Sequence, residues 1–494
     1  MYDELKNLLK HGSIYTVGIV LSRIISFLMI PLYTNYLRPE EYGTLELLSL
    51  SIDIISTVMG FGMTASVLRF YFNKNDSAEK NKVISTAMLG TAIIMGVTSI
   101  LCLIASNQLS DLIFHSSENA GLLRIMFLTM LMTSIGEVPL AYLRIIQKST
   151  KFVLISLIRL ILQLSLNILF LVVLKQGISG ILYSGLITSV LMGIYLASMT
   201  SFETGIRFDR KLYWEMLAYG LPLIVSDISA FVLAFSDRFF LNYYTNLSDV
   251  GIYSLAYKFG MLLSMVFVAP FTQIWSARMF EIYHKENSKE LISKVLTLFL
   301  FGALIINLAI SVLTKDVLRL ISNEAYWSAY KLVPVISLAY VFNGIVYIVG
   351  LGILATGKTK LSALAMILAM AVNIGFNFIL IPHWGKAGAA YATLISYLFR
   401  VILIYVFSQS LFKIKYEWKA LIFIGCISLG IIYLSHFIVV GNKFISLFLN
   451  SLLIVIFAVI SYFSGVFTAK EKVVIRACIR NPMEIRKFIN SGIG

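Results

Sequence analysis

The amino-acid sequence predicts an all-α integral membrane protein of about fourteen transmembrane helices. We expect two six-helix bundles related by an axis along the membrane normal, plus two C-terminal helices. The 494 residues are 59% hydrophobic and only 13% charged, and the mean hydropathy of +0.87 is well above that of soluble domains. Long apolar segments recur along the chain, and one half of the chain resembles the other at a constant offset.

Each apolar segment is long enough to cross a membrane as a helix. A helix rises 1.5 Å per residue, so about twenty residues span a hydrocarbon core of about 30 Å. Leu, Ile and Phe dominate without the alternation of barrel strands, so helices must satisfy the backbone hydrogen bonds inside lipid. The predicted spans are 13–37, 43–72, 83–106, 121–146, 152–174, 178–200, 215–244, 250–280, 291–314, 328–355, 361–382, 387–411, 418–440 and 444–467.

The distribution of Lys and Arg predicts the orientation of the chain. With the N-terminus placed inside, the inner segments hold 25 of the 40 basic residues and the outer segments hold 6. Cytoplasmic loops of membrane proteins carry such an excess, so we expect both termini in the cytoplasm. The net charge of +15 then indicates anionic lipid rather than nucleic acid as the partner of the basic tail.

An internal repeat defines the expected domains. A shift of 208 residues places Phe27 on Phe235 and Gly43 on Gly251, and GISGILYSGLI at 177–187 falls on GKAGAAYATLI at 385–395. The period contains six spans, an even number, so both copies enter the membrane in the same direction. The predicted parts are an N-terminal bundle at 1–206, a C-terminal bundle at 207–412, two further helices at 413–467 and a basic cytoplasmic tail at 468–494.

The loops leave no room for a catalytic domain. The longest outer loop is 107–120, and no phosphate-binding glycine loop, HExxH or GxSxG motif occurs. The three cysteines, Cys102, Cys426 and Cys478, are scattered and match no metal or redox spacing. We therefore expect no cofactor and no metal, and a transporter rather than an enzyme.

Arg23 is the most informative charge, because it lies near the middle of the first predicted span. An ionisable residue at that depth costs about 2.5–3.5 kcal/mol on insertion scales unless it has a partner or a watery cavity. Its guanidinium could bind a phosphate in a central cavity, or pair with a carboxylate such as Asp53 or Glu137. The equivalent position in the second half is Phe231, so the fold shared by both halves does not require the charge.

Four more cations inside the predicted spans are candidate substrate-binding groups: Arg159, Arg238, Lys258 and Arg400. Each could face a cavity or pair with a neighbouring helix, and Lys258 could also reach towards the membrane surface. Their side-chain directions are not fixed by the sequence.

The candidate ion-coupling groups, for a proton or a sodium ion, are Asp53, Glu137, Asp227 and Asp237. A carboxylate near Arg23 could exchange its ion when cargo binds, because the charges compete at short range. Each carboxylate could instead form a structural pair with a neighbouring helix.

The segment YTVGIVLSRIISFLMIPLYTNYLRPEEYGTLEL at 15–47 resembles the polysaccharide-export (Wzx-type) flippases. Their superfamily also holds multidrug and toxin extruders and lipid II flippases. LRPEEYG at 37–43 resembles the loop after the first span of the flippase family, and Ser22-Arg23-x-x-x-Phe27 resembles a first-span motif of lipid II flippases. Beyond about the first 70 residues, the resemblance is one of topology and repeat.

The resemblance implies a V-shaped pair of bundles that moves an undecaprenyl-diphosphate-linked oligosaccharide from the inner to the outer leaflet. It implies alternating access and a cationic cavity for the diphosphate, with Arg23 as the residue that matches the family motif. The implied partners are the lipid-linked oligosaccharide, membrane lipid, a coupling ion, and a polymerase or other polysaccharide-assembly proteins.

Two other classes of protein compete with this interpretation. A multidrug exporter predicts a cavity of carboxylates and aromatic rings that bind organic cations, whereas nine Lys and Arg lie within the predicted spans here. A polysaccharide polymerase or ligase would carry a sizeable outer loop with catalytic Arg or His, whereas the loop 107–120 contains only His115.

Overall fold

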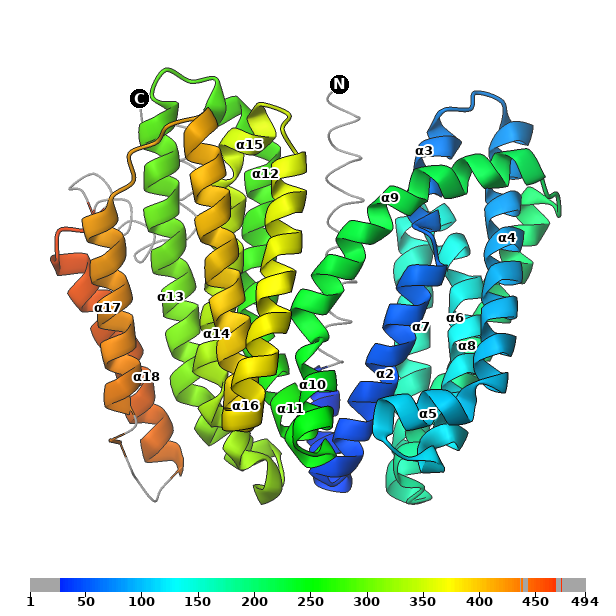
Figure 1. Ribbon diagram of the computed structural model, residues 1–494, viewed down its shortest axis with the longest axis horizontal. Helices are drawn as coiled ribbons and strands as arrows, with labels where there is room; N and C mark the ends of the chain where they lie inside the picture. The colour runs from blue at the N-terminus through cyan, green and yellow to red at the C-terminus, as the bar shows by residue number, and fades with distance from the viewer. Residues whose placement is uncertain (1–26, 436, 439–442, 468–471, 473–494) are drawn as a thin grey trace. The chain divides into compact units, whose positions relative to one another are not determined.

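The protein is helical throughout the computed structural model, which describes residues 27–435, 437–438, 443–467 and 472 (Figure 1). Residues 27–36 belong to the first helix of the described chain. Eleven helices in these ranges are long and apolar enough to cross a membrane, or twelve if the bent helix α9 is one span. The all-α membrane fold is therefore confirmed, while the count of fourteen spans stays a prediction.

The described chain forms two compact units. Unit 1 holds the described residues up to Leu255, together with Ile321–Ser328 and Met366–Ser396. Unit 2 holds Ala256–Leu320, Ala329–Ala365 and the described residues from Tyr397 onward. These units are defined by contacts and have different bounds from the bundles expected at 1–206 and 207–412, which were defined by the sequence repeat. The two bundles therefore remain a prediction.

Unit 1 is built around long neighbouring helices, with α6 beside both α4 and α8 (Figure 1). One of its cores joins α3, α4, α6 and α9 through apolar residues such as Val67, Ile84 and Met216. Its helices are α2 (Pro39–Met59), α3 (Met63–Phe72), α4 (Ser77–Ile104), α5 (Ser106–Phe114), η1 (Ser117–Asn119), α6 (Ala120–Ile145), α7 (Ser149–Asn167), η2 (Ile168–Val173), α8 (Gly177–Thr204), α9 (Arg210–Phe235) and α10 (Asp237–Tyr244).

Unit 2 contains the two C-terminal helices, α17 and α18, which lie side by side (Figure 1) and pack with α13 in one apolar core. Helix α11 (Leu247–Leu263) begins in unit 1 and ends in unit 2. Helices η4 (Glu324–Lys331) and α16 (Lys360–Leu411) are likewise divided between the two units. The other helices, which lie wholly or almost wholly in unit 2, are η3 (Ser264–Val268), α12 (Ala269–Tyr283), α13 (Ser288–Ile321), α14 (Val333–Val349), α15 (Leu351–Ala355), α17 (Trp418–Ser435) and α18 (Lys443–Phe463).

Several predicted spans are interrupted where glycine or proline stands in the sequence. The span expected at 43–72 is broken between α2 and α3, where Gly62 has a φ of 60°. Helix α9, which contains Pro222, bends by 42° between its two parts. Gly385, with φ 51° and ψ −131°, interrupts α16 between the segments predicted as spans 361–382 and 387–411. These breaks give the helices more freedom to shape a cavity than straight spans would have.

Two glycines bring α2 and α11 into backbone contact inside unit 1. A Cβ on Gly43 would lie 2.0 Å from the Leu247 carbonyl oxygen, and one on Gly251 would lie 2.0 Å from the Pro39 carbonyl oxygen. Each would also lie 3.0 Å from the other glycine's nitrogen. The shift of 208 residues aligns Pro39 with Leu247 and Gly43 with Gly251. The contact thus joins two pairs of positions that the predicted repeat aligns with each other.

Candidate functional site

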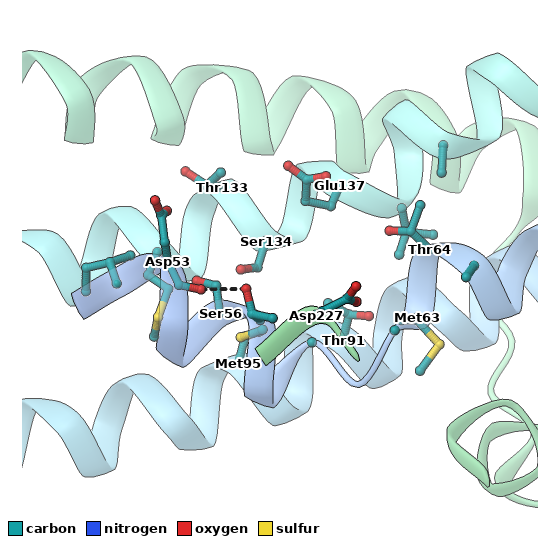
Figure 2. A pocket seen from close by; sticks show the side chains of 18 of the residues that line it. Asp53, Ser56, Met63, Thr64, Thr91, Met95, Thr133, Ser134, Glu137 and Asp227 are labelled. Carbon is teal, nitrogen blue, oxygen red and sulfur yellow. Dashed lines mark hydrogen bonds between the residues drawn. The ribbon is translucent and has the colours of Figure 1, made fainter. Parts of the chain in front are cut away.

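An open cavity of about 1150 Å³ lies within unit 1, lined by residues of α2, α3, α4, α6 and α9 and of the α2–α3 connection (Figure 2). This exceeds the roughly 300–1,000 Å³ of common small-molecule pockets, so it can hold a larger ligand. The lining residues are Ser49, Ile52, Asp53, Ser56, Thr57, Gly60, Gly62, Met63, Thr64, Ala65, Leu68, Thr91, Met95, Met126, Thr129, Met130, Thr133, Ser134, Glu137, Val138, Ala141, Arg144, Ile145, Asp227, Phe231 and Phe235.

Helical periodicity explains how α2 and α6 present polar side chains to the cavity. On α2, Ser49, Asp53 and Thr57 follow one another at intervals of four residues, which keeps them on one face. On α6, Thr133 and Glu137 are likewise four residues apart, and the Thr133 hydroxyl donates to Ser189 Oγ at 3.1 Å. Each helix therefore turns one polar face to the cavity, while apolar residues of α6 pack in the core of unit 1.

Three carboxylates from three different helices line this cavity: Asp53 on α2, Glu137 on α6 and Asp227 on α9 (Figure 2). All three side chains are solvent-exposed. Across the part of the chain that the structure describes, none of the three carboxylates accepts a hydrogen bond or forms an ion pair. An unpaired carboxylate is costly in a membrane protein unless water or a ligand reaches it, so the cavity must be hydrated or occupied.

Hydroxyl groups complete the polar wall of the cavity. Thr91 on α4 is only 8% exposed, and its Oγ1 has no hydrogen-bond partner among the described residues. Ser56, Thr64 and Ser134 also line the cavity (Figure 2). Their hydroxyls form no hydrogen bonds with other described residues. Hydroxyls can donate and accept, so this wall offers both kinds of partner to a polar ligand.

Among the described residues that line the cavity, Arg144 is the one cation. Two aromatic residues, Phe231 and Phe235, also line the cavity. The Arg144 guanidinium lies 5.8 Å from the centre of the Phe152 ring and forms no ion pair in the described chain. The Phe231 and Phe235 rings lie 5.2 Å apart between centroids. Phe231 is the repeat counterpart of Arg23, so the position that corresponds to Arg23 does face this cavity.

Arg23 itself lies outside the described residues, so its predicted role as a substrate-binding group stays a prediction. Of the other eight candidates, the cavity brings together Asp53, Glu137 and Asp227. All three were expected as ion-coupling groups, and that role likewise remains a prediction.

Asp237 and Arg238 form a buried ion pair and do not line the cavity. The Arg238 Nη1 atom lies 2.7 Å from an Asp237 carboxylate oxygen. The Arg238 side chain is 3% exposed and the Asp237 side chain is 1% exposed. Asp237 also accepts hydrogen bonds from the Tyr253 hydroxyl and from Thr393 Oγ1, and Arg238 donates to the Ala234 carbonyl. This geometry favours a structural pair over a substrate-binding or coupling role.

The remaining cations lie apart from the cavity. Arg400, in unit 2, donates from Nη1 to Asn343 Oδ1 at 3.0 Å, and its buried Nε has no partner within the described chain. Arg159 on α7 and Lys258 on α11 are half-buried. None of the three is among the cavity-lining residues. Their binding roles therefore remain predictions without support from this cavity.

Sequence reasoning missed the hydroxyls and Arg144 of the cavity wall. Thr91 and Ser134 are ordinary residues in transmembrane helices, where most hydroxyls bond to a carbonyl one turn earlier, so nothing in the sequence distinguishes them. Arg144 lies at the end of the predicted span 121–146, where a cation can reach the membrane surface. On α6, Ser134 and Arg144 stand three residues before and seven residues after Glu137, which places them on the same helix face. This spacing becomes useful only when the direction of that face is known.

Within the described chain, no three His, Cys, Asp or Glu side chains converge closely enough to hold a metal ion. The three cavity carboxylates are thus spread along the wall rather than gathered at one point, as Figure 2 shows. Such a wall suits a ligand that makes several separate contacts better than it suits one small ion.

Comparison with known proteins identifies the family. The model of the polysaccharide biosynthesis protein family matches residues 8–282, more than half of the chain. A protein of Shigella flexneri assigned to O-antigen transport is 22% identical over 384 residues, covering 74% of this chain and 88% of that protein. The succinoglycan biosynthesis transport protein of Rhizobium meliloti is 24% identical over 244 residues, covering 49% of this chain and 47% of that protein.

Solved structures with the same fold come from two groups of membrane transporters. The lipid II flippase MurJ in an inward closed conformation has a TM-score of 0.75 and 19% identity, covering 92% of this chain and 99% of that one. An inward-facing multidrug resistance transporter of the MATE family has a TM-score of 0.64 and 16% identity, covering 80% of this chain and 97% of that one. At such identities the likeness concerns the fold alone. The chain belongs to the polysaccharide biosynthesis protein family and is a multi-pass membrane transport protein, not an enzyme.

Proposed function

We propose that this protein is a flippase for a lipid-linked oligosaccharide. In this proposal it carries a repeat unit attached to undecaprenyl diphosphate from the inner to the outer leaflet of a bacterial plasma membrane, by alternating access. Family membership and the likeness to an O-antigen transport protein support the class of cargo. The observation that carries the proposal is the cavity of about 1150 Å³ in unit 1, whose wall includes three carboxylates.

Arg23 is the proposed diphosphate-binding group. A guanidinium forms two parallel hydrogen bonds with a phosphate, which suits an arginine at the membrane midplane. Both termini are proposed to lie in the cytoplasm, and the cargo links the protein to a polymerase and other polysaccharide-assembly proteins.

Ion coupling is proposed for the cavity carboxylates rather than for Asp237. A proton or a sodium ion at Asp53, Glu137 or Asp227 would offset the cost of a carboxylate in an emptied cavity. Asp237 already has a guanidinium at 2.7 Å, so it has less need of a second cation.

We expect Arg23→Ala to abolish surface polysaccharide in a host that depends on this chain, because the diphosphate would lose its bidentate partner. Polysaccharide on the cell surface and protein in the membrane fraction are measured together. Arg207→Ala, which removes an arginine from the exposed connection between α8 and α9, is the matched control and should leave both unchanged. Normal surface polysaccharide in the Arg23→Ala strain would contradict the role of Arg23.

A second candidate function is the export of organic cations. The cavity has the two features that this function predicts, unpaired carboxylates and facing aromatic rings. It would place a cationic drug between Phe231 or Phe235 and the carboxylates. The family match favours the oligosaccharide, and transport by the purified protein separates the two functions.

A further inference from the structure

The described residues of the cavity wall carry a net negative charge, although the proposed cargo carries an anionic diphosphate. The described lining residues include three carboxylates, from Asp53, Glu137 and Asp227, and one cation, Arg144. The glycan, which is the part of the cargo beyond the diphosphate, would face this excess of carboxylates.

A second feature of the wall, independent of the carboxylates, indicates a polar ligand. Thr91 is more than nine-tenths buried, lines the cavity, and has no hydrogen-bond partner for its Oγ1 among the described residues. A buried hydroxyl without a partner costs free energy that a ligand hydroxyl can recover. Thr91 and Asp227 line the same cavity (Figure 2).

The spacing of the carboxylates fits a ligand with many hydroxyls. They do not converge on one point, as a single ion would require, but stand on three helices along the cavity. Sugar hydroxyls can donate to each carboxylate in turn, and hydrogen bonds to a charged acceptor are about twice as strong as neutral ones. The apolar faces of sugar rings can pack on Phe231 and Phe235.

We infer that the cavity of unit 1 selects a neutral or basic glycan and discriminates against an acidic one. This inference rests on the proposed flippase function and adds the chemical class of the glycan. A carboxylate on the cargo would be brought next to carboxylates of the wall, and like charges held together in an interior oppose binding strongly. One monovalent coupling ion would neutralise only one of the three wall carboxylates.

The test compares two cargoes in liposomes that contain the purified protein and no ion gradient, so that coupling does not enter the measured rate. One cargo is a polyprenyl-diphosphate-linked trisaccharide of neutral hexoses, and the other has a hexuronic acid as its outermost sugar. A membrane-impermeant oxidant reports how fast each glycan reaches the outer leaflet. The wild-type protein should move the neutral cargo at least about tenfold faster than the acidic one.

Amide variants test whether the carboxylates cause this difference. The triple variant Asp53→Asn, Glu137→Gln and Asp227→Asn keeps hydrogen-bond acceptors for sugar hydroxyls and removes the charge, so it should bring the two rates within about twofold. Glu137→Gln alone should reduce the difference between the two transport rates. This single variant replaces the triple variant in the test if the triple variant does not fold. Glu118→Gln, on the exposed segment before α6, is the matched control and should change neither rate.

The outcomes separate this inference from the proposed function. If the wild-type protein moves both cargoes at one rate, the inference is wrong and the flippase function stands. If the difference survives in a folded triple variant, the carboxylates are not its cause and the inference is wrong. If the wild-type protein moves neither cargo, the flippase function fails, and the inference fails with it.

Discussion

Replacing Gly251 by alanine should prevent the chain from folding stably in the membrane. The added Cβ would lie 2.0 Å from the Pro39 carbonyl oxygen and 3.0 Å from the Gly43 nitrogen. Both atoms belong to the backbone, which cannot rotate away as a flexible side chain does. Overpacking costs about 1–3 kcal/mol where side chains can yield, so we expect a loss of at least about 3 kcal/mol here.

Size-exclusion chromatography in mild detergent and thermal unfolding measure this loss. Gly96→Ala, on α4 within unit 1, is the matched control, since nothing lies within 4 Å of its Cβ position. Alanine is a better helix former than glycine by about 0.8–1.0 kcal/mol, so this variant should be as stable as the wild type or more stable. Gly43→Ala should behave like Gly251→Ala. Equal stability of the Gly251→Ala and Gly96→Ala variants would contradict the close contact between α2 and α11.

Replacing Asp237 by alanine is the second change from which we expect a large effect. It removes the carboxylate 2.7 Å from the Arg238 guanidinium, where both side chains are almost fully buried. Removing one partner of a buried pair costs about 3–5 kcal/mol, because the remaining charge stays in a poorly solvated place. The hydroxyls of Tyr253 and Thr393 lose their acceptor as well.

The free energy of unfolding in detergent, compared between variants, measures this cost. The double variant Asp237→Asn and Arg238→Gln removes both charges and should be more stable than Asp237→Ala alone, since no charge is left buried. Glu203→Ala breaks the exposed pair with Lys148 and should cost at most about 1 kcal/mol. A cost for Asp237→Ala as small as that for Glu203→Ala would show that the buried pair contributes little.

Depth in the membrane could be predicted from the sequence, but the direction of each side chain could not. Asp53, Glu137 and Asp227 were expected as polar groups inside spans, and the structure brings them to one cavity. Asp237 was expected in the same role, yet it lies in a buried pair. The difference depends on the rotation of α2, α6, α9 and α10 about their axes, which apolar residues on every side of a membrane helix do not encode.

The ends of the spans were harder to predict than their existence. Apolar composition predicted one helix at 43–72, whereas Gly62 adopts a left-handed conformation and separates α2 from α3. Glycine adopts a left-handed conformation without steric cost, but a hydropathy profile does not show where the backbone takes that conformation. The contact between Gly43 and Gly251 could be suspected from the sequence, because the shift of 208 residues aligns these two glycines.

Transport by the purified chain in sealed liposomes tests the flippase function most directly. The liposomes contain a polyprenyl-diphosphate-linked neutral trisaccharide in both leaflets, and an impermeant oxidant is added outside. The account predicts that nearly all of the glycan becomes oxidised within minutes, whereas about half stays protected in liposomes without protein. A glycan that stays half protected, in liposomes whose protein carries a fluorescent organic cation across the membrane, would contradict it and identify a cation exporter.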